Sequence, residues 1–354
     1  MRIAIISDTH AGARNSSDIF IEYQRKFYEE VFFPYLNYNN IKQVIHLGDY
    51  YEHRKFINFK ALHENRKQFL EPLRKFGITM DIIPGNHDCY YKNTNELCSL
   101  KELMGYYTDC VNIIQKPEVR DYDGCPIALI PWINPQNYSD TMKFIETCKA
   151  SIVGAHLELD GFEMMKGVIN TPGMSAKVFE RFEHVWSGHF HTKSTRGNIT
   201  YLGSQIEFTW ADCNDDKHFH VFDTETRELI SVRNHITIFE KVIYNDSEND
   251  YFNVDSKIFK DKFVKIVVAS KKDPFMFDKF VDEIQQAGAY EIKIAETFQE
   301  FAGENVNLNE TVAVEDTTKL LDDYVDAVDT ELDKDVIKGM MRNFYVEASN
   351  LEII

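Results

Sequence analysis

The order of apolar and polar positions predicts alternating buried strands and amphipathic helices in the first part of the chain. Short apolar runs at 2–6, 43–47 and 80–83 have the length of buried strands. Between them, apolar residues recur at three- and four-residue intervals over 19–36 and 58–75, which is the spacing of one helix face. This β–α–β–α–β order predicts parallel strands with covering helices.

From residue 111 onward, the pattern changes to a succession of short strand-like runs. They lie at 111–114, 126–130, 151–155, 184–187, 199–202 and 217–222. We therefore expect an α/β chain of the α+β type, in which two β-sheets pack face to face as a sandwich flanked by helices.

A polar, turn-prone stretch at 235–255 predicts a domain boundary. Beyond it, a strand, a helix that ends at Gly288 and a second strand predict a small β–α–β unit between 263 and 294. We predict three parts: a main domain at 1–240, a cap domain at 250–300, and a linker with acidic amphipathic helices at 301–354.

The last part carries half of the negative charge of the protein. Residues 301–354 contain 13 acidic and 4 basic residues, a net charge of −9 out of −18. Apolar residues still recur there at helical spacing, from Leu320 to Leu332 and from Val336 to Tyr345. Two interpretations stay open: a helix pair that packs on its own domain, or helices that bind a partner.

Composition narrows the class of protein. The 354 residues predict about two domains, and the net charge of −18 argues against a protein that simply coats nucleic acid. It does not exclude a nuclease, because bound cations supply positive charge locally. The six cysteines lack C-x-x-C spacing, and no run of 18 apolar residues occurs. We expect a cytoplasmic protein with reduced thiols and no membrane segment.

Five short clusters of metal-binding residue types each follow a predicted strand. They are Asp8-Thr9-His10, Gly48-Asp49, Gly85-Asn86-His87-Asp88, His156, and Gly188-His189-Phe190-His191. Because ligand sites gather at the carboxyl ends of strands in an α/β sheet, these clusters can meet. An extended backbone would also point Asp8 and His10 to the same side. Carboxylate, imidazole and amide ligands favour a hard or borderline divalent cation, so the combination predicts a metal centre.

The order D-x-H, G-D, G-N-H-D, H, G-H-x-H resembles that of the calcineurin-like metallophosphoesterases. The spacing over residues 1–205, the run Gly48–Lys55 and the strand from Pro126 to Trp132 are similar to SbcD-type DNA repair nuclease subunits. The compact length is similar to that of the recombination nuclease subunits of T4-like phages. The β–α–β unit at 263–294 resembles the DNA-facing cap of that family.

The resemblance implies two divalent cations, most often Mn²⁺, with Mg²⁺ or Fe²⁺ as alternatives, and Asp49 as the bridge between them. The other ligands that it implies are Asp8, His10 and His191 for the first cation, and Asn86, His156 and His189 for the second. It also implies that His87 is the acid over the site and that Asp88 orients His87.

The chain departs from the family pattern after Gly48-Asp49. The family often has a histidine three residues after the aspartate, where this chain has Glu52, and the histidine here is His53. His53, Arg54 and Lys55 are candidates for contact with the phosphates of a DNA strand.

The resemblance implies a Mn-dependent DNA exonuclease and endonuclease that acts in recombination and repair. It further implies a homodimer and an SbcC-like coiled-coil ATPase subunit, on which the acidic tail would dock. One alternative is a small-molecule phosphatase or cyclic-nucleotide phosphodiesterase with the same dinuclear site. A second is a binding module without activity, but such modules have usually lost ligands or the acid, which are all present here.

Overall fold

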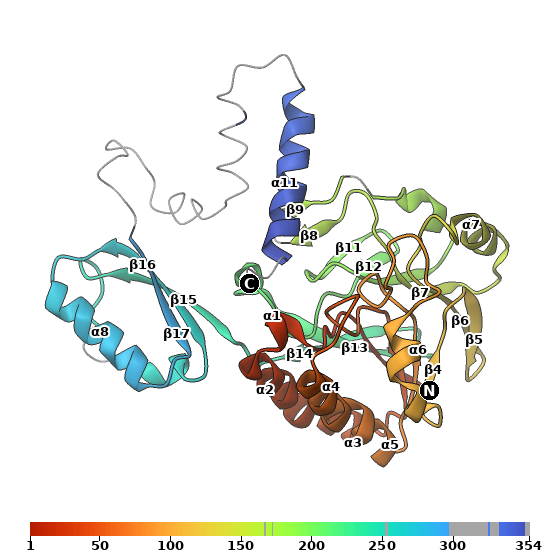
Figure 1. The fold of residues 1–354 in the computed structure, drawn as a ribbon, viewed down its shortest axis with the longest axis horizontal. Coiled ribbons are helices and arrows are strands. Elements are labelled where there is room, and N and C mark those ends of the chain that lie inside the picture. The colour runs from red at the N-terminus through yellow and green to blue at the C-terminus, as the bar shows by residue number, and fades with distance from the viewer. Residues whose placement is uncertain (166–167, 172, 252–253, 297–324, 326–332, 351–354) are drawn as a thin grey trace. The chain divides into compact units, whose positions relative to one another are not determined.

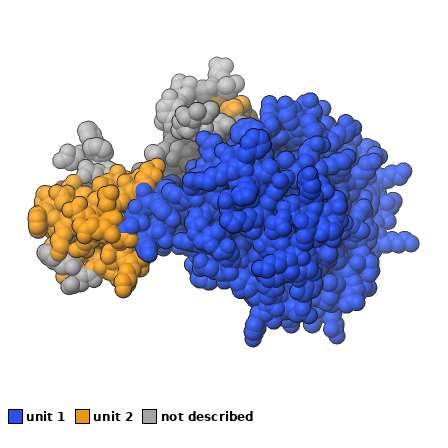
Figure 2. Space-filling model, turned by 60° about the horizontal axis from the view of Figure 1, so that its bottom comes forward, with its two compact units in different colours: residues 1–240, 259–264, 288–290 blue, residues 241–258, 265–287, 291–354 orange. Residues whose placement is uncertain are grey.

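The computed structural model describes residues 1–165, 168–171, 173–251, 254–296, 325 and 333–350. The chain divides into two compact units, shown in Figure 2. The first comprises Met1–Glu240, Phe259–Val264 and Gly288–Tyr290, and the second comprises Lys241–Ile258, Lys265–Ala287 and Glu291–Ile354. The predicted division into three domains, at 1–240, 250–300 and 301–354, stays a prediction.

The first sheet of unit 1 has the order β14-β13-β1-β2-β3-β4. Its strands are β1 (Arg2–Ile6), β2 (Gln43–His46), β3 (Thr79–Ile82), β4 (Val111–Ile113), β13 (Lys217–Asp223) and β14 (Leu229–Asn234). Strands β1 to β4 are parallel, and β13 joins β1 in antiparallel orientation. The parallel half is the one that the β–α–β pattern predicts, and its carboxyl ends lie at one edge.

The second sheet has the order β11-β12-β10-β7-β6-β5. Its strands are β5 (Glu118–Tyr122), β6 (Cys125–Ile130), β7 (Ile152–His156), β10 (His184–Gly188), β11 (Ser194–Arg196) and β12 (Ile199–Tyr201). Strands β6, β7, β10 and β12 are parallel. Ile5 and Ile45 of the first sheet share one buried cluster with Leu129 and Trp186 of the second, so the sheets pack face to face as expected.

Helices cover the outer face of each sheet (Figure 1). One continuous helical run comprises α2 (Asp18–Lys26), a π-type stretch Phe27–Phe32 and α3 (Phe33–Tyr38); another comprises α4 (Phe59–Asn65), a π-type stretch Arg66–Leu70 and α5 (Glu71–Lys75). Their aromatic rings, among them Phe32 and Phe69, pack on Phe219 and Ile6 of the first sheet. The second sheet packs on α7 (Tyr138–Thr147) through Ile145.

The predicted helix over 58–75 begins and ends where its sequence indicates. Asn58 caps it, since its side-chain oxygen accepts hydrogen bonds from the backbone N–H groups of Lys60 and Ala61. Gly77 ends it with a φ of 61°, a backbone conformation that glycine adopts without strain.

Unit 2 contains most of a three-stranded sheet with the order β15-β16-β17. The elements are β15 (Phe239–Asn245), β16 (Phe263–Ser270), α8 (Pro274–Gln286) and β17 (Glu291–Glu296). The predicted β–α–β unit is present, and β15 is an additional strand that the sequence pattern did not indicate. Asp273 caps α8, and Phe277, Phe280 and Ile284 are its buried residues.

Further elements complete the described part of the chain, most of them short. They are α1 (Ala13–Ser16), α6 (Ser99–Leu103), α11 (Lys334–Asn350), the strands β8 (Glu163–Met165) and β9 (Val168–Ile169), and 3₁₀ turns at Gly105–Tyr107, Ala176–Phe179, Trp210–Asp212 and Ser256–Phe259. Helix α11 covers the second apolar stripe of the tail. The first stripe, from Leu320 to Leu332, lies outside the described residues apart from Val325. In the described residues, no helix has the length and apolar content to cross a membrane.

Candidate metal centre

The five clusters converge at the carboxyl ends of β1, β2, β3, β7 and β10. Backbone hydrogen bonds join the loops, from Asp8 N to Gly48 O (2.9 Å) and from His10 N to Asp49 O (3.1 Å). The backbone N–H of His189 donates to the carboxylate of Asp8 at 3.0 and 3.1 Å. The structure therefore brings together clusters that the sequence separates by up to 181 residues.

The first group of donors consists of Asp8, His10 and His191, whose ligand atoms all lie within 4.8 Å of one another. The Nε2 atoms of His10 and His191 are 3.1 Å apart. Asp8 is fully buried, and burial is the main cause that raises the pKa of its carboxyl to about 6. A cation at this position would compensate the negative charge of this buried carboxylate, which the surrounding protein groups stabilise poorly.

The second group consists of Asp49, His156 and His189, again within 4.8 Å of one another. Asn86 completes it, because its Oδ1 lies 3.0 Å from His156 Nε2 and 2.9 Å from His189 Nδ1. The Nδ1 of His156 is paired with the carbonyl oxygen of Leu47 at 2.7 Å. A proton on Nδ1 that donates to this carbonyl leaves Nε2 free to bind a cation.

These spacings fit the predicted cations. Two donor atoms that each bind one cation at about 2.0–2.1 Å are roughly 2.9–3.3 Å apart for angles between a right angle and a tetrahedral one. The His10–His191 distance of 3.1 Å and the Asn86 contacts of 2.9 and 3.0 Å fall in this range. Asp49 belongs to the second group, and its bridging role stays a prediction.

The backbone at the predicted ligands is strained, which corrects the expectation of extended backbone at Asp8 and His10. Positive φ angles occur at Asp8 (52°), His10 (43°), Asp49 (52°) and His189 (93°). Such conformations cost of order 1–3 kcal/mol each for a non-glycine residue and persist where the surrounding structure imposes them. Tight turns, rather than alternation along a strand, direct these side chains to one place.

Two glycines allow the loops to approach this closely. A Cβ atom on Gly188 would lie 2.0 Å from Ser7 Oγ and 2.9 Å from Asp8 Oδ2. A Cβ atom on Gly48 would lie 2.6 Å from the backbone nitrogen of Gly85. Both positions therefore exclude any larger residue.

His87 lies beside the first group of donors. Its ring is edge-on to that of His10, with centroids 4.9 Å apart, and its backbone N–H donates to Asp49 Oδ1 at 2.7 Å. The Nδ1 of His87 is 2.5 Å from the carbonyl oxygen of Glu52. Glu52 thus fixes the ring of His87 with its backbone.

Asp88 lies between the loops that follow β2 and β3. Its carboxylate accepts backbone N–H groups of Gly85 (2.9 Å), Tyr50 (3.1 and 3.2 Å) and Tyr51 (3.1 Å). Burial raises the pKa of this carboxyl to about 6. Among the hydrogen bonds of the described residues, none joins Asp88 to the ring of His87. Asp88 therefore joins the loops after β2 and β3, and its role in orienting His87 stays a prediction.

The three candidates for phosphate contact, His53, Arg54 and Lys55, differ in their surroundings. His53 stacks on Phe56 with ring centroids 4.4 Å apart, and Lys55 Nζ lies 5.8 Å from the ring centroid of Tyr90. Nη1 of Arg54 is buried without a hydrogen-bond partner. Their contact with DNA stays a prediction.

Sequence reasoning missed three residues that contact the predicted ligands. Oε2 of Glu52 lies 2.8 Å from Nδ1 of His10. Lys217 Nζ donates to the carbonyl oxygen of His191 at 2.9 Å. Trp132 packs its ring against those of His156 and His189, at 5.9 and 5.4 Å. Only Glu52 carried a signal, because it occupies the position at which the family often has histidine.

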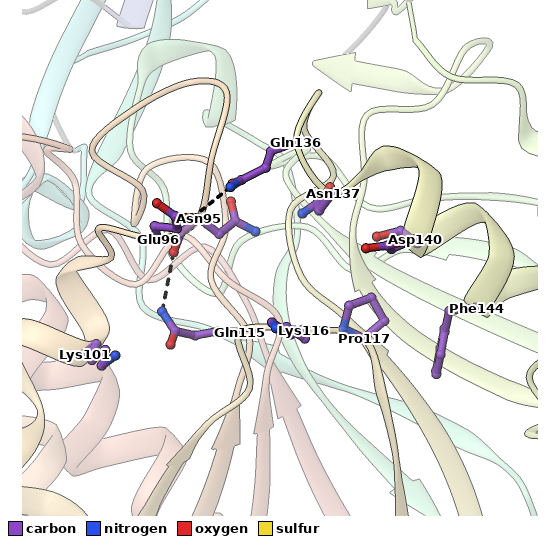
Figure 3. Close-up of a pocket in the computed structure, with 11 residues that line it drawn as sticks. Asn95, Glu96, Lys101, Gln115, Lys116, Pro117, Gln136, Asn137, Asp140 and Phe144 are labelled. Atoms are coloured by element: carbon purple, nitrogen blue, oxygen red, sulfur yellow. Dashed lines mark hydrogen bonds between the residues drawn. The ribbon is translucent and has the colours of Figure 1, made fainter.

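A cavity of about 570 Å³ lies elsewhere in unit 1 (Figure 3). In Figure 3, Gln136 points to Glu96 and Gln115 to Asn95, with hydrogen bonds of 2.9 and 3.4 Å. The wall also includes Lys101, Lys116 and Asp140, but none of the predicted metal ligands. This cavity is therefore separate from the converging histidines and carboxylates.

Comparison with known proteins agrees with this geometry. The family model described as calcineurin-like phosphoesterase matches residues 1–193. Exonuclease subunit 1 of Enterobacteria phage T4 is 29% identical over 352 residues, which cover 99% of this chain and 100% of that protein. A solved structure of an archaeal phosphodiesterase is 16% identical, with a TM-score of 0.34, and the match covers 66% of this chain and 99% of that chain.

The resemblance read from the five clusters is thus confirmed at the level of the family. The matched region spans more than half of the chain and contains all the predicted ligands and His87. This chain belongs to the calcineurin-like phosphoesterase family of enzymes.

Proposed function

We propose that this chain is the nuclease subunit of a DNA recombination and repair complex, in which it hydrolyses phosphodiester bonds of DNA. The observation that carries the proposal is the pair of donor groups at the carboxyl ends of strands from both sheets, with His87 beside them. The similarity to exonuclease subunit 1 over nearly the full chain supports DNA as the substrate class and a further subunit as the partner.

The two donor groups would hold two divalent cations. We assign Asp49 to both; the remaining ligands are Asp8, His10 and His191 for the first, and Asn86, His156 and His189 for the second. The nitrogen and oxygen donors suit manganese, iron and magnesium, and we propose Mn²⁺ on the family resemblance. When bound, these cations would supply Lewis-acid polarisation of a phosphate ester.

His87 would act as the general acid for the leaving oxygen. The carbonyl oxygen of Glu52 accepts the proton on Nδ1, so the proton that His87 exchanges with a substrate is on Nε2. The hydrogen bond from His87 N to Asp49 Oδ1 fixes the backbone of this residue to a predicted metal ligand. These contacts would keep His87 beside the predicted cations.

Asp88 would hold the loop on which His87 lies. Its carboxylate ties Gly85 to Tyr50 and Tyr51, so the loops that carry Asn86 and Asp49 cannot separate without leaving a buried carboxylate unpaired. This role is a positioning one.

Partners beyond DNA follow from the family resemblance. We propose a homodimer and an SbcC-like coiled-coil ATPase subunit, with the acidic tail at 301–354 as the segment that binds the ATPase. His53, Arg54 and Lys55 would contact the DNA backbone. Because the chain has a net charge of −18, only local positive charge would attract a polyanion such as DNA. These side chains and the bound cations would supply it.

The test is cleavage of end-labelled duplex and single-stranded DNA with Mn²⁺, with Mg²⁺ and with chelator, beside an Asp49→Asn variant. Metal-dependent cleavage that the variant lacks would support the proposal. Hydrolysis of a nitrophenyl phosphodiester without cleavage of either DNA would overturn DNA as the substrate and favour a small-molecule phosphodiesterase.

A further inference from the structure

Lys217, the first residue of β13, has a buried ammonium group with three acceptors. The residue is 4% exposed. Its Nζ lies 2.9 Å from the carbonyl oxygen of His191, 2.5 Å from Asp212 Oδ1 and 2.9 Å from Asp215 Oδ2. Because an ammonium has three protons, this arrangement uses all of its donors.

A gain in stability does not explain why this ion pair is buried. Removal of two charges from water usually costs as much as their attraction returns, and apolar replacements are often neutral or stabilising. Lys217 and Asp212 are both buried, so this argument applies to them. What distinguishes the pair is that its third acceptor is the backbone of a predicted metal ligand.

The carbonyl of His191 is held from a second side as well. The backbone N–H of Ser204 donates to it at 3.0 Å. A Cβ atom on Gly203 would lie 3.0 Å from the same oxygen and 2.9 Å from the backbone nitrogen of Lys193, so this turn packs directly on the histidine. Lys217 donates to the same oxygen at 2.9 Å, and Nε2 of the His191 ring lies 3.1 Å from that of His10.

Asp212 extends the support to the side chains around the first donor group. Its Oδ2 accepts the backbone N–H groups of Phe208 (2.9 Å) and Thr209 (2.8 Å). The ring of Phe208 packs against both His10 and His191, with centroid distances of 5.3 and 5.4 Å. The ion pair therefore joins the backbone of His191 to the ring that packs against both histidines.

We propose that Lys217, paired with Asp212, is a positioning residue that holds His191 in place for the first cation. The inference rests on the proposed role of His191 as a metal ligand. Residues that orient a ligand typically change metal affinity by about 10- to 100-fold when they are lost. Lys217 should act on one cation only, because its contacts reach His191 and none of the second donor group.

The test is a calorimetric titration of the full chain with Mn²⁺ alone, with wild type, Lys217→Met and Lys262→Met side by side. Lys262 is the matched control, since its Nζ also pairs with a carboxylate, Glu240, at 2.6 Å, away from the predicted ligands. Wild type and Lys262→Met should bind two Mn²⁺ ions with the same affinities. Lys217→Met should bind one ion about 10- to 100-fold more weakly and the other unchanged.

Loss of Lys217 alone leaves Asp212 buried and unpaired, which can prevent folding. The double variant Asp212→Asn/Lys217→Met removes both charges, and the amide oxygen that the first substitution introduces can still accept from Phe208 and Thr209. The same selective loss of one site is expected there. Two unchanged sites in a folded Lys217→Met or double variant would overturn the inference. A wild type that binds no Mn²⁺ would overturn the proposed metal centre instead.

Discussion

The carboxylate of Glu52 lies 2.8 Å from Nδ1 of His10, and the carbonyl oxygen of Glu52 lies 2.5 Å from Nδ1 of His87. One residue therefore contacts a predicted metal ligand with its side chain and the predicted acid with its backbone. A carboxylate on the far nitrogen of a histidine ligand fixes the tautomer that leaves the other nitrogen free for the cation.

We expect Glu52→Ala to weaken binding of the first cation by about 10- to 100-fold, because His10 loses its orienting carboxylate. The backbone contact to His87 would remain. Calorimetric titration with Mn²⁺ measures the effect, with Glu64→Ala on α4 as a control. An unchanged affinity at both sites would show that the contact is incidental.

Asp49→Asn should abolish binding of both cations if Asp49 is their bridge, since an amide is a much poorer ligand than a carboxylate. Metal content after dialysis against Mn²⁺, measured by elemental analysis, tests this directly. One cation retained per chain would assign Asp49 to the second donor group alone.

His87→Ser should retain the metals and reduce kcat by about 10²- to 10⁴-fold, the usual contribution of a general acid. Among the ring contacts of the described residues, the variant removes one from the first donor group, that between His10 and His87. A kcat within a factor of about three of wild type would remove His87 from the mechanism.

Gly188→Ala should displace Asp8, because the new methyl group would lie 2.0 Å from Ser7 Oγ and 2.9 Å from Asp8 Oδ2. Overpacking of this kind costs about 1–3 kcal/mol in unfolding free energy, and the first cation should bind more weakly. Gly105→Ala is the control, since a Cβ atom there meets nothing within 4 Å. Equal stability and metal binding in both variants would contradict the close approach of the two loops.

Glu207 gives a prediction about pH. The residue is 1% exposed, its Oε2 accepts the backbone N–H groups of Ile238 (2.7 Å) and Phe239 (3.0 Å), and burial raises its pKa from 4.5 to about 7. The folded state therefore binds the proton more tightly than the unfolded state. Its contribution to stability is present below about pH 4.5 and is lost as pH rises towards about 7.

Glu207→Gln stays neutral and keeps an oxygen for both N–H groups. Its advantage in unfolding free energy over wild type should grow by roughly 2 kcal/mol between about pH 5 and pH 8. Urea denaturation at the two pH values measures it, with Glu225→Gln, at an exposed acid, as the control. An advantage that shrinks with pH would contradict the raised pKa.

Some features of this protein follow from its sequence because they depend on local order along the chain. The apolar runs before Asp8, Asp49 and Asn86 identify parallel strands, and each cluster must then lie at a strand end. The helix from Phe59 begins at a capping asparagine and ends before Gly77, since both signals act on neighbouring backbone groups. The metal-binding residues occur in the order that is typical of the family, and this order then indicates a phosphoesterase.

Other features depend on contacts between residues far apart in sequence, and only the tertiary structure decides them. Asp88 is an anchor because the N–H groups of Tyr50 and Tyr51 approach its carboxylate, 38 and 37 residues away. Strand β15 exists as a strand because β16 lies beside it to complete its hydrogen bonds. From its sequence context alone, Lys217 would be expected on the surface. Its burial against the carbonyl of His191 arises only when β13 joins the first sheet next to β1. The residue types of the site can therefore be recognised in short clusters of the sequence, whereas packing brings these clusters together and sets the groups that hold each ligand in place.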